Sequence, residues 1–189
     1  MSAGRGDTQK AADDDRWLDV EQALDLAAEA GLNEDGLIKA LCQGEVRARG
    51  YFVPSQEEAE RNPSVVPVRL TSEFWCAQGQ VRELWESPGI EDFPVEADIH
   101  RPSLEIWIDS HLQQLVRQHA TRPAGRPGRP SPGGFLRALH TARDELKASR
   151  SDRNEEVRAL LVLLTRADPD GLLGPKPSSI KHVIKHVFG

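Results

Sequence analysis

Residues 120–134 constrain the architecture of this chain more than any other segment. These fifteen residues hold four prolines, four glycines and three arginines, with no acidic and no large apolar side chain. Proline and glycine at this density disfavour regular helices and strands and favour an extended, semi-rigid connection. We therefore predict a basic linker over 120–134. It separates a domain over 16–119 from a helical domain over 135–189, and a disordered acidic tail over 1–15 precedes both.

The pattern of residues 16–119 predicts an α+β domain. Asp19, with Gln22 three residues on, predicts the start of a helix that ends at Gly31. Asn33 predicts a second helix, which ends at Gly44. Alternation of apolar and polar residues predicts strands of a small antiparallel sheet over 45–53, 65–70, 81–85 and 95–100. A longer helix capped by Ser103 is expected to pack across these strands.

Beyond the linker we predict three short helices. Phe135, Leu136, Leu139 and Leu146 mark the first helix, and Asp152 begins the second. The residues 168–171 (Asp-Pro-Asp-Gly) predict a turn. Ser178 or Ser179 is expected to cap the last helix, whose apolar stripe is Ile180, Val183, Ile184 and Val187. Three helices with a loop before the last are the minimum for a helix-turn-helix unit.

Charge is divided unevenly along the chain. The net charge is −6, but residues 1–111 hold 10 Lys+Arg against 23 Asp+Glu, while residues 112–189 hold 14 against 7. Such asymmetry indicates a polyanion-binding end or two parts of the chain that attract each other, and chance placement of solvated charges stays open. No stretch approaches the roughly 18 apolar residues of a membrane helix. The start has no secretory pattern, so we expect a cytoplasmic protein with reduced Cys42 and Cys76.

No pattern of catalysis is present in the sequence. It lacks a nucleophile elbow, a His-Glu-x-x-His motif, a phosphate-binding glycine loop and a dinucleotide fingerprint. His182 and His186 have the spacing of a metal pair, but Lys181 and Lys185 flank them and no third ligand stands nearby. We therefore predict neither enzyme activity nor a cofactor nor a metal.

The last helix carries the clearest signal for nucleic acid. Its apolar stripe leaves Lys181, His182 and Lys185 on the outer face, with Ser178 at its start. Lysine pairs with phosphate, and histidine donates to a phosphate or a base edge. An ordinary terminal helix with lysines in solvent is the alternative.

The linker contains Gly125-Arg126-Pro127-Gly128-Arg129-Pro130. This segment resembles the AT-hook, which implies that Arg126 and Arg129, with Arg122, follow the minor groove of duplex DNA. Pro127 separates Arg126 from Gly128 and departs from the Arg-Gly-Arg-Pro core of that motif. A solubilising linker is the other interpretation.

The N-terminal domain carries a second resemblance, on Trp17-Leu18-Asp19-Val20-Glu21-Gln22-Ala23, Leu37-Ile38-Lys39-Ala40-Leu41 and 44–50 (Gly-Glu-Val-Arg-Ala-Arg-Gly). These residues resemble the opening of excisionase and MerR-type winged helices, which implies a helix pair followed by a wing of two strands. Arg47 and Arg49 would be the phosphate contacts of this wing. Glu34 and Asp35 would repel phosphate, so a protein-contact surface is the preferred role of this domain.

The overall layout is similar to that of bacterial proteins of mobile or phage-derived regions. Together these features predict a non-catalytic DNA-binding accessory or regulatory protein. The alternative is an adaptor whose basic C-terminal part binds an acidic protein surface, either a partner's or its own. Trp75, Trp85 and Trp107 would then be core or interface anchors.

Overall fold

The computed structural model describes residues 16–52, 67–70, 75, 95–120, 132–174, 184, 185, 187 and 188. The chain divides into two compact units. Unit 1 comprises residues 1–24 and 34–107, and unit 2 comprises 25–33 and 108–189. The sequence assigns 25–33 and 108–119 to the N-terminal domain, so this division differs from the predicted one.

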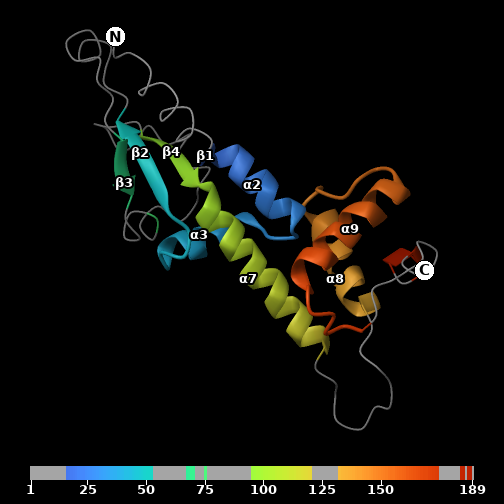
Figure 1. The fold of residues 1–189 in the computed structure, drawn as a ribbon. Coiled ribbons are helices and arrows are strands. Elements are labelled where there is room, and N and C mark those ends of the chain that lie inside the picture. The colour runs from blue at the N-terminus through green and yellow to red at the C-terminus, as the bar shows by residue number, and fades with distance from the viewer. Residues whose placement is uncertain are drawn as a thin grey trace, which may run out of the picture. The chain divides into compact units, whose positions relative to one another are not determined.

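A four-stranded antiparallel sheet organises unit 1. The strand order is β1 (Trp17–Asp19), β4 (Val95–His100), β2 (Ala48–Phe52) and β3 (Pro67–Leu70), as Figure 1 shows. Ile99 of β4 lies opposite both Leu18 and Ala48. The α+β class and the small antiparallel sheet are therefore confirmed, although the sequence did not predict β1. The predicted strand over 81–85 lies outside the described residues.

Small apolar residues form the buried face of the central strands. Ala97 and Ile99 are buried in β4, whereas Asp98 and His100 between and after them are partly exposed. On β2, Ala48 lies opposite Ile99 and Gly50 lies opposite Ala97, and both are buried. This alternation is the one predicted for 95–100, because successive side chains of a strand point to opposite faces.

The two helices predicted from their capping residues are both present. Helix α2 spans Val20–Glu29, and the Gln22 N–H donates to Oδ1 of Asp19 at 2.7 Å. Helix α3 spans Glu34–Cys42. Gly31 and Gly44 follow the two helices with φ of +76° and +72°, the left-handed conformation that glycine adopts at helix ends.

Helix α7 spans Arg101–Ala120 and starts before the predicted cap. Ser103 lies inside its first turn, where its hydroxyl accepts the Arg47 N–H at 3.0 Å and donates to the His100 carbonyl at 2.8 Å. The prediction of Ser103 as the N-cap was therefore wrong, since its side chain joins β4 to the segment before β2. Residues at helical spacing line the buried face of α7: Leu104, Ile108, Leu112 and Val116.

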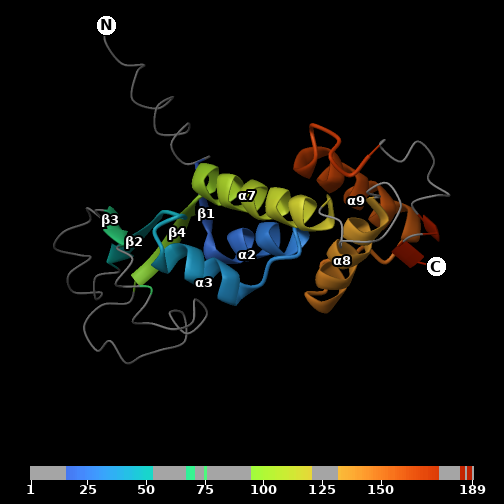
Figure 2. The ribbon, with the colours of Figure 1, turned by 90° about the horizontal axis from the view of Figure 1, so that it is seen from below.

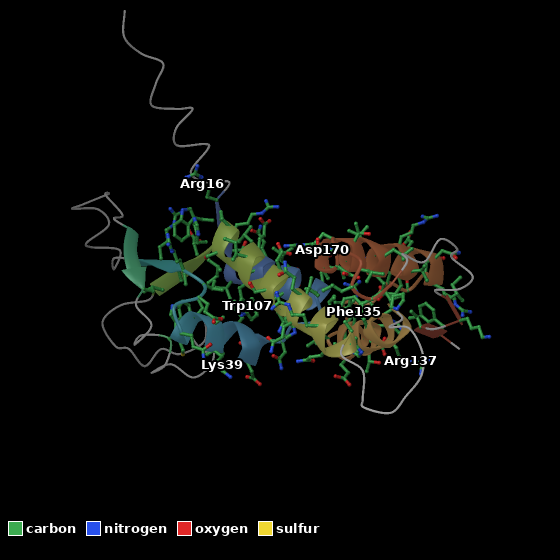
Figure 3. The ribbon with its side chains drawn as sticks, turned by 60° about the horizontal axis from the view of Figure 1, so that its bottom comes forward. Arg16, Lys39, Trp107, Phe135, Arg137 and Asp170 are labelled. Atoms are coloured by element: carbon green, nitrogen blue, oxygen red, sulfur yellow. The ribbon has the colours of Figure 1, made fainter. Side chains whose placement is uncertain are left out.

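Unit 2 contains helices α8 (Pro132–Glu145) and α9 (Arg153–Ala167), which pack against each other (Figure 2). Helix α8 begins at Pro132, inside the predicted linker, because proline fits the first position of a helix, where no N–H is needed. Phe135 is buried on α8, whereas Arg137 on the same helix is exposed (Figure 3). The predicted apolar stripes supply the shared core: Phe135, Leu136, Leu139, Val157, Leu160 and Leu164.

Both predicted ends of α9 are confirmed. The Asp152 carboxylate caps the helix by accepting the N–H groups of Asn154 and Glu155 at 2.8 and 2.9 Å. Asp168 ends it, and its carboxylate accepts the N–H groups of Leu172 and Leu173. Gly171, at φ +69°, completes the turn. These two hydrogen bonds satisfy the acceptor atoms of Asp168, a residue that is only 5% exposed.

Candidate nucleic-acid interface

Most residues of the predicted DNA-binding set lie outside the described residues. These are Arg122, Arg126 and Arg129 of the linker, and Ser178, Lys181 and His182 of the last helix. The AT-hook resemblance and the cap of the last helix therefore stay predictions. Lys185, Arg47 and Arg49 belong to the described part of the chain and can be placed.

Lys185 is helical and exposed. Ile184 and Val187, on either side of it in sequence, are half-buried and buried respectively. This difference is the one expected of an amphipathic helix that packs one face and presents the other. At these positions the arrangement agrees with an outward-facing lysine.

The two arginines of the predicted wing differ in their environments. Arg47 precedes β2, and its side chain is exposed. Arg49, on β2, forms an ion pair with Asp98 of β4, with 2.9 Å between Nη2 and Oδ2, and its guanidinium lies 4.4 Å from the ring centroid of Trp17. The ring of Trp17 in turn lies 5.0 Å from that of His100. Arg47 is therefore the more accessible cation of the pair, while Arg49 has a structural role within the sheet.

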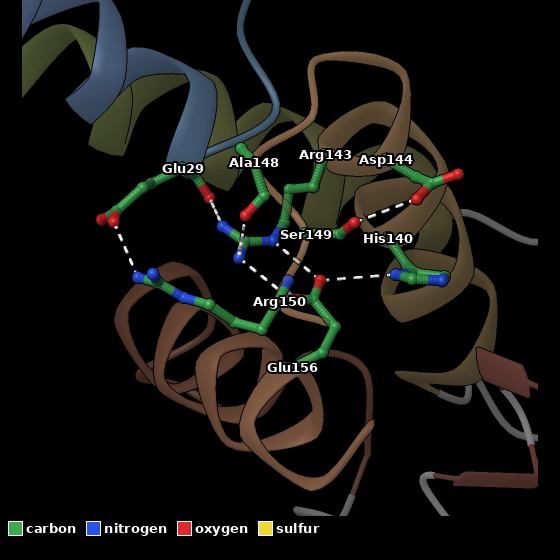
Figure 4. Close-up of polar contacts among 8 residues, drawn as sticks. All are labelled: Glu29, His140, Arg143, Asp144, Ala148, Ser149, Arg150 and Glu156. Carbon is green, nitrogen blue, oxygen red and sulfur yellow. Dashed lines mark hydrogen bonds and ion pairs between the residues drawn. The ribbon is translucent and has the colours of Figure 1, made fainter. Parts of the chain in front are cut away.

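A buried ion pair joins α8 and α9 in unit 2 (Figure 4). Nε and Nη2 of Arg143 donate to Oε1 and Oε2 of Glu156 at 2.9 and 3.0 Å, and both side chains are 1% exposed. Arg143 also donates to the carbonyl oxygens of Ala148 and Glu29. The Arg150 N–H donates to Oε2 of Glu156 at 2.8 Å. This network, which we call the Arg143–Glu156 cluster, holds residues of three segments together.

The cluster keeps Glu156 ionised. Burial alone would raise the pKa of the Glu156 carboxyl, but the hydrogen bonds and positive charge of Arg143, the Arg150 N–H and the His140 contact together lower it below its ordinary value. His140 Nδ1 lies 3.3 Å from Oε1 of Glu156. Elsewhere in unit 2, burial lowers the pKa of His111 on α7, because the charged imidazolium is disfavoured away from water.

The Arg143–Glu156 cluster was not predicted from the sequence. A signal for it was present, because Arg143 falls four residues after Leu139 and Glu156 four residues before Leu160, on the apolar stripes of their helices. A single charge at such a position is unfavourable, but two opposite charges on facing stripes predict a buried pair.

Residues 112–189, the basic part of the sequence, bury two of their acids and leave nearly all of their described bases exposed. Of the seven Asp and Glu residues of 112–189, Glu156 and Asp168 are buried. Of the nine Lys and Arg residues that the structure describes in this range, only Arg143 is buried. The eight exposed bases are Arg117, Arg137, Lys147, Arg150, Arg153, Arg158, Arg166 and Lys185. Among the described charged residues of 112–189, the exposed ones are therefore eight bases and five acids.

Two of these exposed bases form ion pairs within unit 2. Nη2 of Arg150 lies 2.9 Å from Oε1 of Glu29, and Arg166 pairs with Asp109. Both acids belong to the acidic part of the sequence, residues 1–111. Oppositely charged parts of the sequence therefore pair with each other at these two places. Such pairing was one of the interpretations of the charge asymmetry.

The described ranges contain no group of three or more His, Cys, Asp or Glu side chains that could hold a metal ion. The candidate pair His182 and His186 lies outside those ranges. Trp75 is 2% exposed, a core position, whereas Trp107 is half-buried. No helix that the structure describes has the length and apolar character needed to cross a bilayer.

Comparisons with protein-family models, with curated proteins and with solved structures gave no match. Any inference about function therefore depends on the residues of this chain.

Proposed function

We propose that this protein is a non-catalytic, duplex-DNA-binding accessory or regulatory protein. The observation that carries the proposal is the charge distribution of residues 112–189. Eight of the nine described bases of 112–189 are exposed, whereas two of its seven acids are buried and hydrogen-bonded. A surface rich in Lys and Arg attracts the phosphate backbone, which supplies most of the affinity of non-specific DNA binding.

In this proposal, each basic segment has a separate role on the duplex. Arg122, Arg126 and Arg129 of the linker follow the backbone or the minor groove. Lys181, His182 and Lys185, with Ser178 at the helix start, place the last helix in the major groove. The exposed side chain of Lys185 supports the second role.

The order of the elements between α2 and β3 supports a winged-helix-like interpretation in part. Helices α2 and α3 lead directly into the antiparallel pair β2 and β3, whose register joins Ala48 to Leu70. Arg47, at the start of this pair, is exposed and can reach a phosphate. In this proposal the acidic remainder of the domain recruits a protein partner or a second copy of the chain.

The proposal is tested by titrating a labelled, mixed-sequence duplex with the full chain and measuring fluorescence anisotropy. We expect binding that weakens about 10-fold or more between 50 and 200 mM salt, because counterions are released from several phosphates. The triple variant Arg122→Ala, Arg126→Ala, Arg129→Ala should weaken binding. The matched control, Arg137→Ala, Lys147→Ala, Arg158→Ala, removes the same charge elsewhere and should weaken it less. No binding at 50 mM salt would contradict the proposal.

The second candidate function is that of an adaptor with an acidic protein ligand. The ion pairs Arg150–Glu29 and Arg166–Asp109 favour it, because bases of the C-terminal helices already pair with carboxylates there. Poly-glutamate separates the two candidates. If it displaced the duplex at an equal concentration of charges, the surface would recognise any polyanion; if it bound while the duplex did not, the adaptor function would be favoured.

A further inference from the structure

Phe188 docks between two helices of unit 2. Its ring centroid lies 4.6 Å from that of His140 on α8, in an edge-on arrangement with 62° between the ring planes. The guanidinium carbon of Arg153, the first residue of α9, lies 4.8 Å from the same ring. Phe188 therefore lies against the start of α9.

One cation lies over the Phe188 ring, and another stands three residues before Phe188 in the sequence. Lys185 and Phe188 are both helical and stand three residues apart in the sequence. Arg153 approaches the same ring from α9. Both Lys185 and Arg153 are exposed, and within the described residues neither forms an ion pair.

Among the described residues, no nearby acid forms an ion pair with Arg153. The Asp152 carboxylate accepts two backbone N–H groups at the start of α9. Glu155 lies two residues after Arg153, a spacing at which helical side chains do not face each other. Glu156 is buried and paired with Arg143.

We propose that Arg153 is a phosphate contact of the DNA-binding surface, as Lys185 is, and that Phe188 is the positioning residue that holds the Arg153 guanidinium. This inference rests on the proposed function. A guanidinium stacked on an aromatic face keeps its N–H groups available at its edge, and stacking restricts its side chain before binding. Arg153 is thus better prepared for a phosphate than an unrestrained surface arginine.

The test uses the full chain and a labelled, mixed-sequence duplex, with anisotropy measured across a series of salt concentrations. Arg153→Ala and Lys185→Ala should each weaken binding about two- to fivefold and should reduce the slope of log affinity against log salt by about one. Arg158→Ala is the matched control, since Arg158 is an exposed arginine of the same helix. Because Arg158 is one of the eight exposed bases of 112–189, its removal should weaken binding and reduce the slope, but less than Arg153→Ala does. Arg153→Lys keeps the charge and should keep the slope.

Phe188→Ala tests the positioning role, because it removes no charge. We expect it to weaken binding and to make the added effect of Arg153→Ala smaller than in the unaltered chain, the non-additivity of coupled residues. Circular dichroism and the thermal midpoint establish that each variant folds.

The possible failures are distinguishable. If the unaltered chain binds DNA but Arg153→Ala behaves like Arg158→Ala, this inference is overturned and the proposed function stands. If Phe188→Ala and Arg153→Ala act additively, the positioning role of Phe188 is overturned. Absence of binding by the unaltered chain overturns the proposed function, and this inference with it.

Discussion

Arg143 and Glu156 form a two-point ion pair in the interior of unit 2, with donor–acceptor distances of 2.9 and 3.0 Å and 1% of each side chain exposed. Removal of one partner leaves the other charge buried without compensation. We therefore expect Arg143→Ala to lower the free energy of unfolding by about 3–5 kcal/mol. Urea denaturation measures the change, and Arg158→Ala, on the surface of α9, should stay within about 0.5 kcal/mol of the unaltered chain.

Replacing both partners of the ion pair should be far less harmful than replacing one. In the double variant Arg143→Met, Glu156→Leu, apolar side chains of similar length fill the site, and no charge is left unpaired. We expect most of the loss of the single variant to be recovered. A double variant as unstable as Arg143→Ala alone would show instead that the bonds from Arg143 to the Ala148 and Glu29 carbonyls dominate.

The low pKa of Glu156 makes the stability of unit 2 depend on pH. Because the carboxyl pKa is lower in the folded chain than its ordinary value of 4.5, the unfolded chain binds more protons as the pH falls below that value. The contribution of Glu156 is therefore complete above about pH 4.5 and is lost as the pH falls through the folded pKa. Urea midpoints measured between pH 7 and pH 3 should show this loss, and Glu156→Gln should flatten it.

His111 contributes a separate dependence at higher pH. Its pKa is lowered from 6.5 by burial, so protonation favours the unfolded chain, and stability falls as the pH drops below about 6.5. His111→Gln should remove this part of the pH profile and leave the part due to Glu156. An unchanged profile in His111→Gln would contradict the assignment.

Arg47 and Arg49 should give opposite results in binding and stability measurements. Arg49 pairs with Asp98 and stacks on Trp17, so Arg49→Ala should lower the free energy of unfolding by about 1 kcal/mol. Arg47→Ala should leave stability within about 0.5 kcal/mol but weaken DNA binding, because that side chain is exposed. Thermal melts and anisotropy titrations of both variants check the prediction. Equal effects of the two variants would contradict the separate roles.

Gly31 is expected to tolerate no side chain. Its φ is +76°, and an added Cβ would lie 3.0 Å from Cβ of Ala142 and 3.2 Å from Cδ1 of Leu139. Strain and overpacking together should make Gly31→Ala about 1–3 kcal/mol less stable. Gly36→Ala is the control, since Gly36 lies inside α3, where alanine is the better helix former. Differential scanning calorimetry of the two variants should show changes of opposite sign.

Local chemistry explains which elements the sequence could predict. Asp19 and Asp152 cap their helices through their own side chains, and Gly31 and Gly44 end helices through their positive φ, so each signal lies within a few residues of its effect. The strand at Val95–His100 was predicted correctly because its alternation of buried and partly exposed residues is visible in the sequence itself.

Features that depend on distant partners were missed. Strand β1 has only three residues and exists because it pairs with β4, which no short window of sequence contains. Ser103 looks like a cap, yet its hydroxyl bonds to the segment at Arg47, 56 residues away. No role was predicted for Arg143 or Arg153, because their partners Glu156 and Phe188 become neighbours only in the folded chain.

The strand order of unit 1 has a consequence for how this part of the chain forms. Strand β4 lies between β1 and β2, although it is the last of the four described strands to leave the ribosome. A nascent chain that ends before Val95 contains β1 and the pair β2 and β3, but it lacks the strand that joins them. The unpaired edges of these strands are then exposed to other chains. The segment Val95–His100 therefore closes the sheet from its middle, and fragments prepared for biophysical work must extend through it.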